Sequence, residues 1–336
     1  MKKIRVGLNG FGRIGRAFTR IALTRGNFEI AVINTRKSEN KMMAYTLQYD
    51  SVYRRFAKKV TATDRGLDID GVVIPTILND KPENIPWEKY DVDVVVDATG
   101  AFTKTDDLQK HIKGTVKKVL LTSPAKDDMP HIVLGVNDRD IDFAGQGVFS
   151  NASCTTNCAS PLFKVLHDNF NIVSGALTTV HAVTQTQSLL DDNGKSFDRS
   201  RAAFQNIIPS TSGAAKAVAK TIPDLKGKLE VGSIRVPVPT ASLSDVTVIV
   251  EKKATVEEVN VAFKAASEES MKGILQYETE TLVSSDYIGS PYSCVFDANY
   301  TKVINGYMIK VMGWYDNEWG YSTRMVDLVE KVSDYV

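Results

Sequence analysis

The sequence predicts an α/β dinucleotide-binding domain followed by an α+β domain with a mostly antiparallel sheet. A glycine-rich turn separates a strand from a helix close to the N-terminus. Short apolar strands then alternate with helices up to about residue 150, and longer strands of alternating polarity follow. A chain of 336 residues is too long for one small core, so we expect two domains.

The first half shows strand and helix signals in turn. "IRVGL" is a short apolar strand over 4–8, and Gly26 is a plausible stop for the helix that follows. The apolar residues of that helix, at i, i+3, i+4, i+7 and i+8, are Ile14, Ala17, Phe18, Ile21 and Ala22. Next come a strand ending at Asn34, a helix after Ser38, and the strands "VDVVVDATG" and "KKVLLTS" around a helix containing "LQKHI". Such Val/Leu-rich strands predict a parallel sheet covered on both faces.

The second half has longer strands in which polar and apolar residues alternate. The segments "GALTTVHAV", "KLEVGSIRVPV", "SDVTVIVEK" and "TKVINGYMIKVMGW" read as strands with one covered face. A helix over 255–269 begins with a capping box formed by Thr255 and Glu258. Helical spacing in the last segment, which we expect to pack on the first domain, involves Tyr321, Met325, Leu328 and Val332. The predicted domains are 1–153 with 317–336, and 154–316.

Composition and charge exclude several classes of protein. A net charge of +1 gives no reason to expect a dedicated nucleic-acid or membrane partner. No apolar run is long enough for a membrane span, and the N-terminus lacks the pattern of a signal peptide. The three cysteines, Cys154, Cys158 and Cys294, are too few for a disulfide framework, and their spacing suits no metal site. We therefore expect a cytoplasmic protein.

The glycine-rich turn carries the first candidate site. Gly10, Gly12 and Gly15 form G-x-G-x-x-G directly after a strand and at the start of a helix. The first glycine permits a tight turn, the second allows a pyrophosphate to approach the backbone, and the third allows close packing of helix and strand. The helix N-terminus adds partial positive charge. A purely structural glycine turn is the alternative.

Cys154 is the second candidate. In "SNASCTTNCASPL" it follows a strand and starts a helix, where free backbone N–H groups and the helix dipole favour thiolate. Taken alone, a cysteine is more often a small buried hydrophobe than a nucleophile.

A histidine elsewhere in the sequence favours the catalytic interpretation of Cys154. His181 ends the apolar strand in "TTVHAVT", where its side chain can reach a cleft. A cysteine at a helix start and a histidine at a strand end form the pair that activates a thiolate and moves a proton. The alternative is a hydrogen-bonded core histidine. We expect His111 in a helix and His167 on a charged helical stretch. Neither is accompanied by motif residues like those around His181.

Several motifs together resemble one family. "NGFGRIGR", "SNASCTTNC", "TTVHA", "NIIPSTSGAAKAV", "RVPVP" and "WYDNEWGYS" occur in the order and spacing of phosphorylating glyceraldehyde-3-phosphate dehydrogenases. The resemblance extends from about residue 3 to 334. It implies a Rossmann domain that binds NAD or NADP, a catalytic α+β domain, a final helix returning to the first domain, and a cytoplasmic homotetramer.

The resemblance also implies catalytic roles. Cys154 would attack the aldehyde of glyceraldehyde 3-phosphate, and His181 would take the hydroxyl proton while hydride passes to the nicotinamide. Inorganic phosphate would then cleave the thioester to give 1,3-bisphosphoglycerate. A thiolate forms and leaves acyl groups readily, and an imidazole titrates near neutrality.

Binding residues follow from the same resemblance. Thr184 and Arg235 would hold the substrate phosphate. The inorganic-phosphate site would comprise Ser153, Thr155, Arg199, Ser212 and Gly213. The cofactor residues would be Gly10, Phe11, Gly12, Arg13, Ile14, Asn34, Thr35, Arg36, Thr99, Gly100, Thr122, Asn317 and Tyr321. Surface ion pairs are the alternative for the two arginines, and a core position is the alternative for Tyr321.

The sequence departs from the family at the cofactor loop. Thr35 stands where NAD-selective members place an aspartate, which would repel a 2′-phosphate. Arg36 and Lys37 could attract that phosphate, or could simply point into solvent. In the family, a loop that reaches towards the adenosine ribose of a neighbouring subunit has a Leu-Pro pair where this sequence has Asp192 and Asn193. Asp192 should repel a 2′-phosphate, whereas Asn193 could donate to one. We predict relaxed use of NAD and NADP with a preference for NADP.

Other departures and readings remain open. Ser212 replaces the usual threonine of the phosphate pocket and keeps its hydroxyl, whereas Thr240 replaces a common asparagine without an evident consequence. Erythrose-4-phosphate dehydrogenase shares the cysteine and histidine motifs and is the nearest alternative. A dinucleotide-binding interaction protein without catalysis is the second, although such a protein needs neither Cys154 nor His181.

Overall fold

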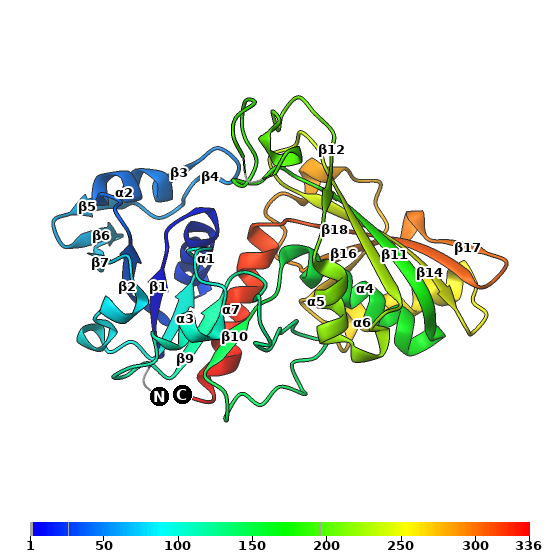
Figure 1. Ribbon diagram of the computed structural model, residues 1–336, viewed down its shortest axis with the longest axis horizontal. Coiled ribbons are helices and arrows are strands. Elements are labelled where there is room, and N and C mark those ends of the chain that lie inside the picture. The colour runs from blue at the N-terminus through cyan, green and yellow to red at the C-terminus, as the bar shows by residue number, and fades with distance from the viewer. Residues whose placement is uncertain (1–2, 26, 195) are drawn as a thin grey trace. The chain divides into compact units, whose positions relative to one another are not determined.

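A computed structural model describes residues 3–25, 27–194 and 196–336, so the predicted helix stop at Gly26 lies outside the described residues. The chain forms two compact units, each built on one eight-stranded sheet (Figure 1). The first unit contains Met1–Ile132, Asp140–Ala152 and Ser322–Val336, and the second contains Val133–Arg139 and Ser153–Tyr321.

The first sheet has the strand order β10-β9-β8-β1-β2-β7-β6-β5. Its strands are β1 (Arg5–Asn9), β2 (Glu29–Thr35), β5 (Val60–Thr63), β6 (Gly66–Ile69), β7 (Val72–Leu78), β8 (Val94–Asp97), β9 (Lys118–Leu121) and β10 (Val148–Ser150). All pairs from β10 to β7 are parallel, which confirms the predicted parallel sheet. The antiparallel edge of β5, β6 and β7 was not predicted. Its outer strands β5 and β6 are only four residues long and lack the Val/Leu runs of the central strands.

The helices of this unit largely follow the sequence pattern. They are α1 (Arg13–Arg25), α2 (Asn40–Gln48) and α3 (Thr105–Gln109), with 3₁₀ turns at Pro82–Asn84 and Trp87–Tyr90 and a small ladder of β3 (Tyr49–Asp50) with β4 (Arg54–Arg55). The prediction that His111 is helical was wrong, because α3 ends before it. Trp87 Nε1 donates to His111 Nδ1 at 3.0 Å, so a buried tertiary contact fixes this segment as a turn.

The last helix, α7 (Trp319–Ser333), returns to the first unit from Ser322 onwards, as predicted. Arg25, at the end of α1, forms ion pairs with Glu330 at 2.6 Å and with Asp327. The cation at the C-terminus of α1 also complements the dipole of that helix.

The second sheet has the order β12-β13-β11-β14-β18-β16-β15, with β17 on β18. Its strands are β11 (Ile172–His181), β12 (Ile208–Thr211), β13 (Leu229–Arg235), β14 (Ser242–Val250), β15 (Leu275–Glu278), β16 (Cys294–Asp297), β17 (Lys302–Ile304) and β18 (Met308–Tyr315). Only β11–β13 and β15–β16 are parallel among the described pairs, so the mostly antiparallel prediction is confirmed. The predicted strand over 301–314 is instead a hairpin, because Asn305 and Gly306 both take positive φ as in a type I′ turn.

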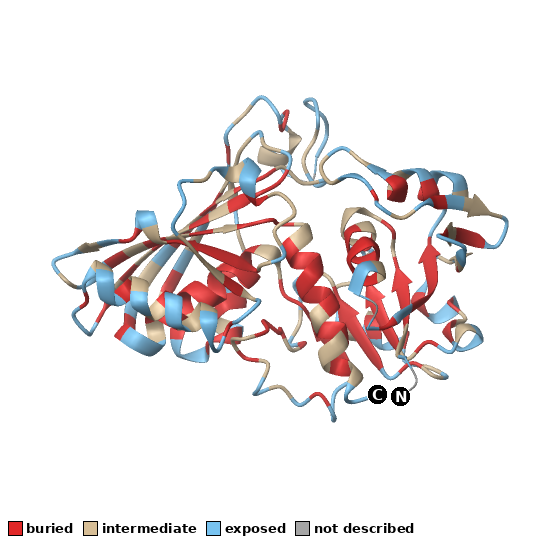
Figure 2. Ribbon diagram, turned by 180° about the vertical axis from the view of Figure 1, so that it is seen from behind, coloured by how far each residue is buried: buried red, intermediate tan, exposed pale blue. Residues whose placement is uncertain are grey.

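The strands of the two sheets differ in how far their residues are buried (Figure 2). Strands β8 and β9 are buried throughout, whereas β14 alternates between buried and half-buried residues along its length. The helices of the second unit are α4 (Cys154–Phe170), α5 (Ala214–Thr221) and α6 (Val256–Glu268), with 3₁₀ turns at Asp198–Ser200, Pro223–Leu225, Ser284–Tyr287 and Ala298–Tyr300. Helix α4 packs on β14, β16 and β18. The capping box of Thr255 and Glu258 is present at the start of α6.

Within the described ranges, no helix is both long enough and apolar enough to span a bilayer.

Candidate active site

Cys154 is the first residue of helix α4. The preceding Ser153 is its N-cap, and the Ser153 hydroxyl accepts a hydrogen bond from Thr156 N at 3.0 Å. Ala152 takes a φ of 53°, a left-handed conformation that is uncommon for a residue with a side chain. The strained turn and the cap direct Cys154 to a helix N-terminus, the position predicted from the sequence.

His181 lies at the end of β11, and its Nε2 atom is 3.5 Å from Cys154 Sγ. The imidazole is buried. The structure therefore brings together two predicted residues that are separated by 27 positions in the chain.

The other ring nitrogen of His181 determines its tautomer. Nδ1 lies 2.7 Å from the carbonyl oxygen of Ala182 and 2.8 Å from Arg235 Nη1. Arg235 Nη1 is also 3.1 Å from the Ala182 oxygen. A carbonyl can only accept and an arginine can only donate. We infer that Nδ1 carries the proton for Ala182 and that Arg235 donates to the same carbonyl, which leaves the Nε2 lone pair facing the sulfur.

Burial sets the acid–base properties of the pair. It raises the pKa of the Cys154 thiol to about 11, against the opposing charge of Arg235. Burial, reinforced by the Arg235 charge, lowers the pKa of His181 to about 3. Each group alone resists ionisation, but thiolate and imidazolium stabilise each other at this distance. Transfer of the thiol proton to Nε2 would form both charges at once, so that each offsets the cost of the other.

Tyr315 supports the pair and was missed by the sequence analysis. Its hydroxyl is 3.1 Å from Thr155 Oγ1 and 2.8 Å from Thr179 Oγ1. Its ring meets the His181 ring edge-on, with centroids 6.0 Å apart. Tyr315 lies within the motif "WYDNEWGYS", which supports the family resemblance, but the sequence pattern alone indicates no role for this tyrosine.

Two arginines are available for anions. Arg235 Nε is buried and has no hydrogen-bond partner among the described residues. Arg199 donates to the Thr186 hydroxyl, which lies 2.9 Å from Thr184 Oγ1. The charge of Arg199 also contributes to lowering the pKa of His181, after burial and Arg235, so its charge acts on the same site. Thr186 was not predicted.

Ser212 and Gly213 stand at the start of α5. Gly213 is the N-cap, and Ser212 Oγ accepts from Ala214 N at 3.2 Å. Helix α5 has no acidic residue in its first turn, so its free N–H groups can donate hydrogen bonds to an anion. Within the described part of the chain, no hydrogen bond joins Ser212 or Gly213 to Cys154 or His181.

The glycine turn of the first unit fits a dinucleotide. A Cβ at Gly10 would lie 2.8 Å from the Ala98 backbone, and one at Gly15 would lie 2.3 Å from the Gly10 oxygen. At Gly12 the space within 4 Å is open, as an approaching pyrophosphate requires. Helix α1 has no acidic residue in its first turn to repel that group.

Comparison with known proteins decides the family. Residues 4–105 match the model of the glyceraldehyde 3-phosphate dehydrogenase NAD binding domain, and residues 153–317 match the C-terminal domain of the same family. Similar proteins include glyceraldehyde-3-phosphate dehydrogenase 2 of Streptomyces avermitilis, 49% identical over 97% of both chains. The glyceraldehyde-3-phosphate dehydrogenase of Geobacillus stearothermophilus is 48% identical over 98% of both chains. The chain belongs to the glyceraldehyde-3-phosphate dehydrogenase family. It is an oxidoreductase with a nicotinamide dinucleotide cofactor.

The cofactor residues expected for this family occupy ordered positions in the first unit. Gly10 N donates to Asn34 O at 2.8 Å, and Asn34 Nδ2 donates to Asn9 Oδ1 at 2.7 Å. The Arg13 side chain is held by Asp50 at 2.9 Å. The remaining turn residues are the buried Phe11 and the half-buried Ile14.

The loops after β8 and β9 are tied to one buried carboxylate residue. Thr99 Oγ1 donates to Asp97 Oδ1 at 2.6 Å, and Thr122 N donates to the Asp97 backbone carbonyl at 3.0 Å. Gly100 takes a φ of 65° with open space around its Cβ position. These residues stand at the carboxyl end of the parallel strands, where ligands of doubly wound sheets bind.

The loop that follows β2 carries no acid at positions 34–37. Thr35 is buried, and its hydroxyl accepts from Ser38 N at 3.3 Å. Arg36 and Lys37 are exposed. The Asp192 carboxylate accepts from Asn193 N within its own exposed loop in the second unit.

Asn317 and Tyr321 belong to the second unit, and both are buried. Asn317 Oδ1 accepts from Ser242 Oγ at 3.0 Å. Tyr321 is 4% exposed, which agrees with the core position given as its alternative.

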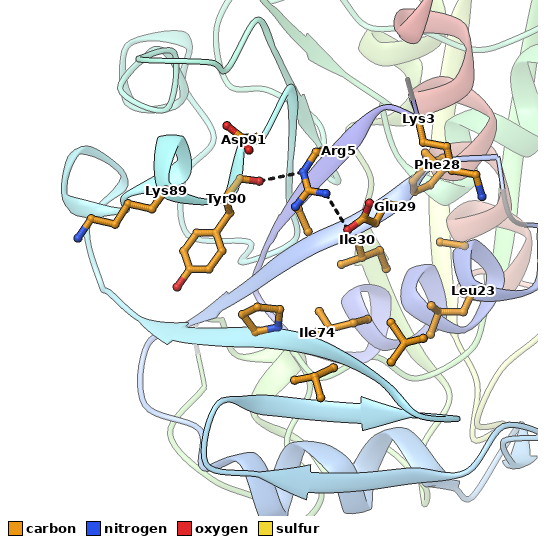
Figure 3. A pocket seen from close by; sticks show the side chains of 15 residues that line it. Lys3, Arg5, Leu23, Phe28, Glu29, Ile30, Ile74, Lys89, Tyr90 and Asp91 are labelled. Carbon is orange, nitrogen blue, oxygen red and sulfur yellow. Dashed lines mark hydrogen bonds and ion pairs between the residues drawn. The ribbon is translucent and has the colours of Figure 1, made fainter. Parts of the chain in front are cut away.

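A separate hollow of about 460 Å³ lies at the amino ends of β1 and β2, away from the glycine turn (Figure 3). Arg5 crosses it and is engaged by Glu29 at 2.8 Å and by the Tyr90 carbonyl at 3.1 Å. None of the predicted site residues lines this hollow.

Two glycine variants separate packing from binding. Gly15→Ala should lower the free energy of unfolding by about 1–3 kcal/mol, because its Cβ meets backbone. Gly12→Ala should change it by less than about 1 kcal/mol yet weaken dinucleotide binding, because the methyl fills the open approach. Urea unfolding and fluorescence titration with NAD and NADP measure the two effects. Unchanged binding by Gly12→Ala would contradict the proposed position of the pyrophosphate.

Proposed function

We propose that this protein oxidises glyceraldehyde 3-phosphate to 1,3-bisphosphoglycerate, using NAD or NADP and inorganic phosphate. The observation that carries the proposal is the part-buried contact of 3.5 Å between Cys154 Sγ and His181 Nε2, beside the Arg235 guanidinium. A nucleophile, a base and a fixed cation in one place suit a phosphorylated aldehyde.

The first half of the reaction uses the cysteine and the histidine. The Cys154 thiolate forms a C–S bond with the aldehyde carbon as the carbonyl π bond breaks, and the proton that His181 Nε2 took from the thiol passes to the oxygen, which gives a hemithioacetal. His181 Nε2 then accepts the hydroxyl proton as that carbon is oxidised to a thioester. The bound dinucleotide supplies the hydride acceptor. The Ala182 carbonyl stabilises the protonated ring through Nδ1, which lies 2.7 Å away.

The second half releases the product. An oxygen of inorganic phosphate attacks the thioester carbonyl, the C–S bond breaks, and Cys154 leaves as a thiolate. The N–H groups at the start of α4 favour that leaving thiolate. Ser153, Thr155, Arg199, Ser212 and Gly213 are the residues assigned to inorganic phosphate by resemblance to the family.

Arg235 and Thr184 are assigned to the phosphate of the substrate. The buried Nε of Arg235 has a donor to spare within the described chain, and an arginine fork matches phosphate geometry. Phosphate bound there would also offset the cation that lowers the pKa of His181. Substrate binding would thereby make the base stronger.

We infer a homotetramer in the cytoplasm, with no dedicated nucleic-acid or membrane partner. Support for assembly comes from the segment 185–207 of the second unit. It exposes Leu189, Leu190, Phe197 and Ile207, each more than two-thirds accessible. Apolar patches of this kind mark protein interfaces. The functional domains remain assigned as 1–153 with 317–336 for the cofactor and 154–316 for catalysis.

We further propose relaxed cofactor use with a preference for NADP. The strand-end position offers Thr35, whose hydroxyl is engaged by Ser38 N, so no carboxylate repels a 2′-phosphate. The exposed Arg36 and Lys37 add positive charge to the same loop.

The substrate assignment predicts dependence on both the aldehyde and phosphate. Initial rates should favour glyceraldehyde 3-phosphate over erythrose 4-phosphate by at least about tenfold, because the motifs of the phosphate pocket resemble those of the glyceraldehyde-3-phosphate enzymes. Turnover should stop after one acylation when phosphate is omitted. Indifference to phosphate would reject the proposal in favour of the erythrose-4-phosphate enzyme, and absence of turnover on both aldehydes would favour a binding protein.

The cofactor assignment predicts the effect of one substitution. Thr35→Asp should shift the ratio of kcat/KM values towards NAD by roughly fivefold or more, because a carboxylate about 4 Å from a phosphate costs on the order of 1 kcal/mol in water. Thr35→Asn, which is similar in size but uncharged, is the control. An unchanged ratio in Thr35→Asp would show that this loop does not choose the cofactor.

A further inference from the structure

The Asn317 side chain is held on one side only. Its Oδ1 atom lies 3.0 Å from Ser242 Oγ and 3.3 Å from Thr240 Oγ1. All three residues are at least 95% buried. No hydrogen bond in the described chain uses Asn317 Nδ2.

The hydrogen bonds of Ser242 fix which way the amide points. Ser242 Oγ accepts from Ala182 N at 3.1 Å, so its own proton is free to be donated to Asn317. Turning the amide by 180° would leave that proton without an acceptor among the described residues and would place an NH₂ group against Thr240. An unsatisfied buried donor costs about as much as a lost hydrogen bond.

Thr240 reinforces this arrangement from the preceding loop. Its hydroxyl lies 3.2 Å from Asp316 Oδ1 as well as 3.3 Å from Asn317 Oδ1, so one proton is shared between neighbouring acceptors. Asp316 in turn accepts from Glu318 N and Trp319 N, which fixes the segment before α7. The amide of Asn317 thus stands on a fixed backbone with a fixed orientation.

Ser242 also links Asn317 to the histidine. The same Ala182 whose N–H bonds Ser242 supplies the carbonyl that bonds His181 Nδ1. Asn317 and His181 are therefore connected through Ala182 and the single hydroxyl of Ser242.

We propose that Ser242, supported by Thr240, is a positioning residue that keeps the Asn317 NH₂ directed at the carboxamide of the nicotinamide. This inference rests on the proposed function, which assigns Asn317 to that group by family resemblance. Both hydroxyls act through Asn317 and touch no reacting atom. Thr240, which replaces an asparagine common in the family, keeps a donor for Oδ1.

The test compares two ligands that differ only in the nicotinamide. Ser242→Ala should raise the Kd of the preferred dinucleotide by about three- to tenfold and leave the Kd of ADP-ribose, or its 2′-phosphate if NADP is preferred, unchanged. Thr240→Val should raise the Kd of the dinucleotide by a smaller factor. Thr240→Ser keeps the hydroxyl and should therefore bind the dinucleotide as wild type does. Ser244→Ala is the matched control, since Ser244 lies on the same strand and its buried hydroxyl has no partner among the described residues.

A double substitution removes the remaining ambiguity. In an Asn317→Ala background, Ser242→Ala should cause no further loss of dinucleotide binding. Equal losses for both ligands, full additivity with Asn317→Ala, or no change in Ser242→Ala would each overturn the inference. If Asn317→Ala itself leaves the ratio of the two Kd values unchanged, both the inference and the assignment of Asn317 fail. Turnover of the wild-type protein on glyceraldehyde 3-phosphate tests the proposed function separately.

Discussion

The contact between Cys154 and His181 is the interaction on which the site depends. Helix α4 and strand β11 meet so that Cys154 Sγ and His181 Nε2 lie 3.5 Å apart in a part-buried contact. Burial disfavours the charged form of each group alone, and passing the proton from one to the other would form two charges that stabilise each other. The Ala182 carbonyl and the Tyr315 ring hold the imidazole in the geometry that permits this transfer.

The charge of Arg235 has opposite effects on the two catalytic candidates. Its charge opposes protonation of His181 and favours the Cys154 thiolate. Its unused Nε donor suits an anion, and an anion bound there would reduce the cost. An anion bound to this cation, which lies 2.8 Å from the histidine, would therefore strengthen the base.

The sequence predicted features that depend on local pattern. The glycine turn, the capping box at Thr255, the helix start at Cys154 and the strand end at His181 each have a short-range signal. It did not predict features that depend on tertiary contacts. His111 leaves the helical conformation because it bonds Trp87. Tyr315, Thr186 and Ser242 acquire their partners only when segments that are apart in the chain meet. The hairpin at Asn305 and Gly306 did carry a local signal, which the alternating pattern around it concealed.

The most direct test of the pair is the pH dependence of Cys154 alkylation by iodoacetamide in wild type and in His181→Asn. Only thiolate reacts, and the raised pKa of an isolated Cys154 leaves little thiolate below about pH 11. Wild type should react near neutrality because His181 receives the proton, whereas His181→Asn should react slowly there and accelerate continuously as pH rises. Cys154→Ser supplies the background from Cys158 and Cys294, which are both buried. Superimposable profiles for wild type and His181→Asn would contradict joint ionisation of the pair.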